Sequence, residues 1–150
     1  MKILVATDKP FAKEAIEKIK SKVDTAGFQF DLLEKYKTKE ELKNAVAEVD
    51  ALIVRSDIID EEIIDSAKNL KIVVRAGAGY DNIDLDAASK KNICVMNTPG
   101  QNANAVAELA LGLMVYAVRN FYNGNPGTEL LGKKIGIHAF GNVGKNVARI

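Results

Sequence analysis

Short apolar runs alternate with amphipathic segments along the first hundred residues. Runs typical of strands occupy residues 2–6, 28–32, 51–54, 72–74 and 93–96. Between them, residues at helical spacing predict helices over 13–20, 38–49, 60–67 and 85–91, with Thr38 and Asp84 as caps and Glu41 completing a capping box after Thr38. Strict alternation of strands and helices predicts an α/β fold with a parallel sheet. Five such strands fit the flavodoxin-like order 2-1-3-4-5.

The pattern changes at Asn-Thr-Pro-Gly, residues 97–100, which marks a domain boundary. The next segment, 103–121, predicts a helix that is apolar over most of its circumference and must be covered by something substantial. A loop at 123–127, a strand at 134–138 and a helix from Asn142 follow. We therefore divide the chain into domains 1–97 and 98–150. We expect residues 103–150 to be disordered alone, or ordered only by packing against another chain.

Composition narrows the class of protein. The chain has 150 residues, of which 47% are apolar and 27% charged, with a net charge of +1. Near-neutral charge favours neither a nucleic-acid nor a membrane partner, and the longest apolar stretch, 105–118, contains Glu108 and is too short to span a bilayer. Residues 2–6 are too short for a signal peptide. Cys94 is the single cysteine, which fits a reducing compartment, and we expect it to be a buried small hydrophobe. These features predict a cytoplasmic protein.

A candidate anion site follows the fourth predicted strand. Arg75 ends that strand, and the loop at residues 76–79 contains two glycines, so its backbone N–H groups can approach a ligand. Arg55 ends the third strand, which neighbours the fourth in the predicted order. Two guanidiniums at one edge suit a ligand with a carboxylate and a second anionic group. Two alternatives stay open: the arginines form surface ion pairs with Asp57 or Asp81, and the glycines only turn the chain.

A second glycine-rich turn lies where the predicted strand at 134–138 leads into a helix. Gly141 and Gly144 occupy the second and third positions of the dinucleotide fingerprint G-x-G-x-x-G, while Ala139 replaces the first glycine. Gly141 would let the backbone approach a pyrophosphate, and Gly144 would let the helix pack closely on the strand. The Ala139 methyl group restricts the tight turn without forbidding it.

Several motifs occur together in this chain. They are Val-Arg-Ser at 54–56, Asn-Leu-Lys at 69–71, Arg-Ala-Gly-Ala-Gly-Tyr-Asp-Asn-Ile-Asp at 75–84, Asn-Thr-Pro-Gly-Gln-Asn at 97–102, Ala-Glu-Leu at 107–109 and Gly-Thr-Glu-Leu-Leu-Gly-Lys-Lys at 127–134. In this combination the chain resembles the D-2-hydroxyacid dehydrogenase family over nearly its whole length. The resemblance implies a flavodoxin-like substrate-binding domain followed by the start of a Rossmann domain that binds NAD.

The resemblance also implies roles for individual residues. Substrate-binding positions would be Arg55, Ser56, Arg75, Ala78, Gly79 and Asn102, the last of these lining an interdomain cleft. Cofactor-binding positions would be Ala78, Ala139, Gly141, Asn142, Val143 and Gly144. The family often has a basic residue where Asn142 stands, and its segment between positions 120 and 127 is usually longer.

The implied reaction is NAD-dependent oxidation of a D-2-hydroxy acid. Two arginines favour a phosphorylated substrate, 3-phosphoglycerate, whose oxidation begins serine biosynthesis; glycerate or lactate is the alternative, and a non-catalytic NAD(H)-sensing protein is another. The family's catalytic arginine, acidic residue and histidine lie beyond the position where this chain ends, so we expect no catalytic residue and no metal site here, and no activity from these residues alone. His138 is predicted to be structural. We also expect a homo-oligomer.

Overall fold

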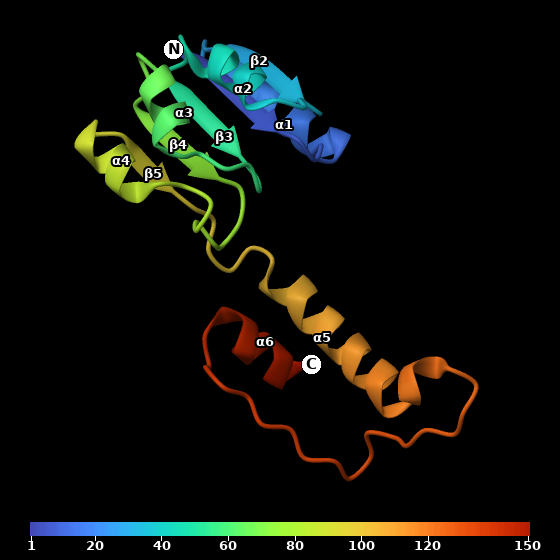
Figure 1. Cartoon of the computed structure of the whole chain (residues 1–150). Helices are drawn as coiled ribbons and strands as arrows, with labels where there is room; N and C mark the ends of the chain where they lie inside the picture. Colours follow the sequence, from blue (N-terminus) through green and yellow to red (C-terminus); the bar gives the residue numbers. More distant parts are fainter. The chain divides into compact units, whose positions relative to one another are not determined.

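A parallel sheet of five strands forms the centre of the first unit, Met1–Thr98, in the computed structural model, which describes residues 1–150 (Figure 1). The strand order is β2-β1-β3-β4-β5, so the predicted flavodoxin-like order is confirmed. The strands are β1 (Lys2–Thr7), β2 (Gln29–Glu34), β3 (Ala51–Val54), β4 (Ile72–Arg75) and β5 (Cys94–Met96). The inner strands are the most apolar, as expected of parallel strands covered on both faces.

Four helices connect these strands: α1 (Lys13–Thr25), α2 (Lys39–Val46), α3 (Glu61–Ser66) and α4 (Leu85–Lys90). The predicted caps are confirmed, because the side chains of Thr38 and Asp84 accept backbone N–H groups at the starts of α2 and α4. The capping box takes a different form from the usual one. The Glu41 carboxylate accepts the Thr38 hydroxyl at 3.0 Å.

The hydrophobic core of this unit is one cluster between the sheet and helices α2, α3 and α4. The strands contribute alternate residues such as Leu52 and Val54, and α3 contributes Ile63 and Ile64, all fully buried. Because the strands are parallel and in register, residues of one face meet the same helices. The core therefore fixes the sheet and, with it, the loops at the carboxyl ends of the strands.

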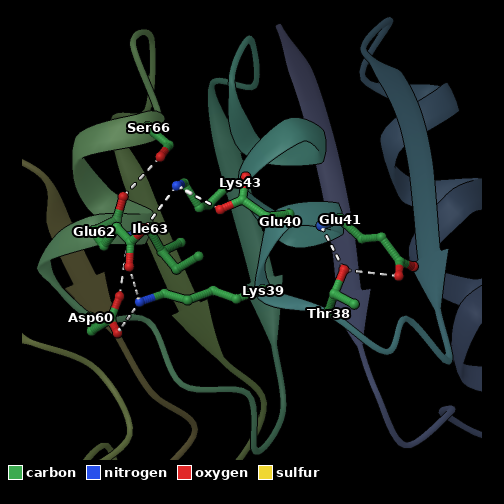
Figure 2. Close-up of polar contacts among 9 residues, drawn as sticks. All are labelled: Thr38, Lys39, Glu40, Glu41, Lys43, Asp60, Glu62, Ile63 and Ser66. Atoms are coloured by element: carbon green, nitrogen blue, oxygen red, sulfur yellow. Dashed lines mark hydrogen bonds and ion pairs between the residues drawn. The ribbon is translucent and has the colours of Figure 1, made fainter.

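Ion pairs between α2 and α3 lie on the outer side of this helical layer (Figure 2). Glu62 contacts Lys39 and Lys43, while Lys39 also contacts Asp60 at 2.7 Å and Lys43 also contacts Glu40 at 2.9 Å. The hydrogen bonds from the two lysines, that from Lys39 first, lower the pKa of Glu62 to about 2. These groups are exposed, so the network stabilises the fold only weakly.

The second unit, Pro99–Ile150, contains α5 (Ala103–Val118), a 3-10 turn η1 (Asn120–Tyr122) and α6 (Asn142–Arg149). Helix α5 ends before the predicted residue 121, because residues 120–122 have φ values of 53–54°, which a right-handed helix cannot contain. Helices α5 and α6 pack against each other. The expectation that these residues are ordered only by packing against another chain stays a prediction, and large apolar residues of α5 such as Leu109 and Leu113 are exposed in this unit. Neither they nor the helices of the first unit are long and apolar enough to cross a membrane.

Two further sequence predictions are corrected by the structure. Residues 134–138 do not form a strand, because the second unit contains no other strand with which their backbone could pair. His138 is exposed in this segment rather than part of a strand. Cys94 is exposed rather than buried, because β5 lies at the edge of the sheet. The residue at the other end of this strand, Met96, is exposed as well.

Candidate functional site

The carboxyl ends of β3 and β4 bring two arginines to the same edge of the sheet. Val54 pairs with Arg75 in the parallel register, and the Ala76 N–H donates to the Val54 carbonyl at 2.8 Å. Arg55 follows Val54 directly. The strand order thus places both arginines where the sequence predicted them, at one edge and on adjacent strands.

The Arg75 side chain folds back over the glycine loop. A Cβ atom built on Gly77 would lie 1.4 Å from the Arg75 Nη1, so the guanidinium occupies the space that a side chain at Gly77 would need. The Arg75 Nε is buried and has no hydrogen-bond partner. The loop beneath it is held by the Gly77 N–H, which donates to the Arg75 carbonyl, and by the Thr98 N–H, which donates to the Gly77 carbonyl, both at 2.8 Å.

Neither arginine forms an ion pair. Every ion pair in the structure uses a lysine as its cation. The alternative in which Asp57 or Asp81 neutralises the arginines is therefore not what the structure contains. The Asp81 carboxylate instead lies beside Gly79, 3.0 Å from the position of a Cβ built there. Two guanidiniums without carboxylate partners leave this edge able to bind an anion.

The loops after β3 and β4 are tied to each other. Ile59 and Ile83 form a parallel bridge, in which the Ile59 N–H donates to the Asn82 carbonyl at 2.8 Å and the Asp84 N–H donates to the Ile59 carbonyl at 2.9 Å. The Asn97 amide group donates to the Ala78 carbonyl at 2.7 Å. Hydrogen bonds therefore join the loop that begins at Arg55 to the loop that contains residues 76–79.

A buried carboxylate, which the sequence did not single out as functional, lies beneath Arg55. Asp57 is only 4% exposed. It accepts hydrogen bonds from the Asp8 N–H at 2.8 Å, the Tyr36 hydroxyl at 2.6 Å and the Arg55 N–H at 3.3 Å. Burial and then the hydrogen bond to Asp57 raise the pKa of Tyr36 above its ordinary value. Ser56 is exposed beside Asp57 and lines a cleft of about 420 Å³ with Asp8 and Tyr36.

The second glycine turn has the geometry that its sequence requires. Ala139 has a φ of +71°, so it adopts the left-handed conformation that the missing first glycine would supply. A Cβ built on the buried Gly144 would lie 2.4 Å from the Ala139 carbonyl oxygen, so the chain passes too closely for any side chain there. A Cβ on Gly141 would meet nothing within 4 Å, which leaves its backbone open to a ligand.

The remaining predicted residues lie around these elements. Asn142 is the first residue of α6, and its amide group lies against Gly100, 2.9 Å from a Cβ built there. Val143 is 39% exposed, and Asn102 is exposed just before α5. No group of three or more His, Cys, Asp or Glu side chains is placed to hold a metal ion. Within each unit, the structure thus brings the predicted residues of that unit onto neighbouring segments.

Comparison with known proteins identifies the class. The family model of the D-isomer specific 2-hydroxyacid dehydrogenase, catalytic domain, matches residues 3–148. The chain therefore belongs to the D-2-hydroxyacid dehydrogenase family.

Individual relatives of the chain carry more specific names than the family. A hydroxypyruvate reductase of Thermotoga maritima is 39% identical over 97% of this chain and 50% of its own length. A D-3-phosphoglycerate dehydrogenase of Archaeoglobus fulgidus is 37% identical over 99% of this chain and 30% of its own. Among solved structures, a 3-phosphoglycerate dehydrogenase of Entamoeba histolytica bound to NAD+ is 49% identical with a TM-score of 0.95, over 99% of this chain and 49% of that one. The chain spans half or less of the length of each of these proteins.

Proposed function

We propose that the protein carrying this chain oxidises 3-phosphoglycerate to 3-phosphohydroxypyruvate with NAD. The observation that carries the proposal is the pair of arginines, Arg55 and Arg75, at the ends of adjacent strands and without carboxylate partners. A phosphorylated carboxylic acid has two anionic groups for them. The relatives named D-3-phosphoglycerate dehydrogenase support this substrate.

The first unit is assigned to substrate binding. Arg55 and Arg75 bind the two anionic groups, the Ser56 hydroxyl adds a hydrogen bond, and the backbone of Ala78 and Gly79 faces the carboxylate. Their contribution is positional and electrostatic, because holding both ends of the substrate aims its C2 atom at the cofactor. Asn102 is assigned to the substrate as well.

The second unit is assigned to the cofactor, and its residues fit a pyrophosphate. The first turn of α6 carries no side-chain cap, so its backbone N–H groups are free for an anion. The open backbone of Gly141 and the tight turn from Ala139 to Gly144 match the geometry of a dinucleotide fingerprint. Asn142 and Val143 lie beside this turn, and Ala78 is assigned to the nicotinamide end. NAD, when bound, accepts the hydride from the substrate.

Two further assignments accompany this function. A single cysteine among these residues supports a reducing, cytoplasmic location. We also propose that the protein assembles as a homo-oligomer.

The test compares a phosphorylated and an unphosphorylated substrate. In the full-length enzyme, R55A should raise the KM for 3-phosphoglycerate about 10- to 100-fold, as expected when a charge-assisted hydrogen bond is lost. The KM for D-glycerate should change far less. As a matched control, K22A removes an exposed cation of α1 that has no ion-pair partner, and it should change neither KM.

Other outcomes would favour another function. Equal effects on both substrates would show that Arg55 does not bind the phosphate, and would favour the unphosphorylated substrates that the Thermotoga maritima relative's name indicates. An enzyme that binds NAD but oxidises neither substrate would favour a sensing protein.

A further inference from the structure

We propose that Asp57 is a positioning residue for the substrate, which sets the place of Arg55 through the backbone. The proposal rests on the proposed function, in which Arg55 binds an anionic group of the substrate. Asp57 itself is 4% exposed, at the wall of the cleft that Ser56 also lines, and the proposal gives it no contact with the substrate.

Asp57 is the point at which four carboxyl-edge segments meet. Its side chain accepts hydrogen bonds from Asp8, which follows β1, from Tyr36, which follows β2, and from the backbone of Arg55, which follows β3. Its own carbonyl accepts the Asn82 amide group at 2.7 Å, from the loop after β4. One residue thus connects the segments after β1, β2, β3 and β4.

The chemistry of a buried carboxylate makes this arrangement rigid. An ionised carboxylate can accept about four hydrogen bonds, and a buried one is costly unless donors satisfy it. Here three donors from three segments converge on Asp57, so a shift in any of them would leave part of a buried charge unpaired. Because the Arg55 N–H is one of these donors, the backbone at Arg55 is held in place as well.

Arg55 depends on this support because its side chain has no other anchor. Its guanidinium is exposed and forms neither an ion pair nor a hydrogen bond within the chain. Before substrate arrives, only the backbone at residue 55 therefore limits where the guanidinium can be. Arg75 differs, because it is held against its own loop at Gly77.

The variant D57N tests the proposal in the full-length enzyme. The amide keeps the size of the carboxylate, but its NH2 group must face one of three donors. We expect the KM for 3-phosphoglycerate to rise about tenfold, the factor that corresponds to one lost charge-assisted hydrogen bond, with kcat nearly unchanged. Y36F removes a single donor and should give a smaller rise in KM, which keeps the test available if D57N does not fold.

A double-mutant cycle separates positioning from general stability. In the R55A background, D57N and Y36F should cause no further rise in KM, because the group that they position is absent. The matched control is D50N. Like Asp57, Asp50 accepts a hydrogen bond from a backbone N–H, that of Lys2 at 2.8 Å, and it forms an ion pair with Lys71 at 2.7 Å. Unlike Asp57, it lies at the amino edge of the sheet. D50N should lower the unfolding midpoint and leave the KM unchanged.

Each result decides the proposal. A rise in KM that is the same with Arg55 and with R55A would overturn the positioning role of Asp57 and leave the proposed function standing. An unchanged KM in both D57N and Y36F would do the same. If R55A alone leaves the KM for 3-phosphoglycerate unchanged, the proposed role of Arg55 fails, and the role of Asp57 fails with it.

Discussion

Replacing Gly77 by alanine should displace the Arg75 guanidinium while leaving the backbone in place. The new Cβ would lie 1.4 Å from Nη1, 2.4 Å from Cζ and 3.2 Å from Nε of Arg75. Non-bonded carbon and nitrogen atoms need about 3.5 Å, so the guanidinium must move by about 2 Å. The three nearest atoms all belong to this one flexible side chain, so we expect no backbone segment to shift.

The two consequences of this change differ in size. Alanine reduces the freedom of the unfolded chain, which favours folding by about 0.4–1 kcal/mol and offsets the lost contact between Arg75 and its loop. We therefore expect the free energy of unfolding to change by less than about 1 kcal/mol. Anion binding should weaken much more. Loss of a charge-assisted hydrogen bond is worth about 1.5–3 kcal/mol, which corresponds to about 10- to 100-fold in Kd.

Titration calorimetry with 3-phosphoglycerate and guanidinium-chloride unfolding would measure both quantities for G77A. The matched control is G112A in α5, whose Cβ would meet open space. It should stabilise the helix by up to about 1 kcal/mol and leave the affinity unchanged. If G77A bound 3-phosphoglycerate as tightly as the parent while R75A bound it weakly, the folded-back position of Arg75 would not be the one that binds the anion.

Two further predictions concern the second glycine turn and the surface ion pairs. G144A should lower the free energy of unfolding by about 1–3 kcal/mol, because its Cβ would meet the Ala139 carbonyl oxygen at 2.4 Å. G141A, whose Cβ would meet no atom, should leave the free energy of unfolding unchanged and weaken NAD binding, measured by fluorescence titration. Equal losses of stability in the two variants would contradict this. The low pKa of Glu62, about 2 against an ordinary 4.5, means that its stabilising effect is present above about pH 4.5 and is lost as the pH falls through 2. E62Q should therefore lower the thermal midpoint slightly at pH 7 and low salt, but not near pH 2 or at high salt. The control E48Q should leave the midpoint unchanged, because Glu48 has no lysine partner. A loss in E62Q that does not depend on salt would refute an electrostatic cause.

The sequence predicts the sheet and the two arginines because both follow from local pattern and connectivity. Alternating strand and helix segments force parallel strands, and parallel strands bring their carboxyl ends to one edge. Residues that end neighbouring strands, Arg55 and Arg75, must then lie on that edge. The caps Thr38 and Asp84 were equally predictable, because a cap bonds a residue three positions away.

Features that depend on distant partners were not predictable in the same way. Asp57 bonds Asp8 and Tyr36, which are 49 and 21 residues away, so no local window distinguishes it from a surface carboxylate. The one available signal was its position three residues after the end of β3 and two residues after Arg55. Residues 134–138 show the converse: their pattern is that of a strand, but a strand needs a neighbour, and the second unit holds none.

The turn at Ala139 separates two reasons for which a chain uses glycine. At Ala139 the requirement is conformational: a φ of +71° costs an alanine about 1 kcal/mol, which good packing nearby can offset. At Gly144 the requirement is spatial, because a side chain would overlap the Ala139 carbonyl and no rearrangement short of moving the backbone would relieve it. The chain has alanine where the requirement is only conformational, and glycine where a side chain would separate α6 from the turn. The imperfect fingerprint therefore keeps the close approach at Gly144, which in the proposed function holds the first turn of α6 where it can bind a phosphate.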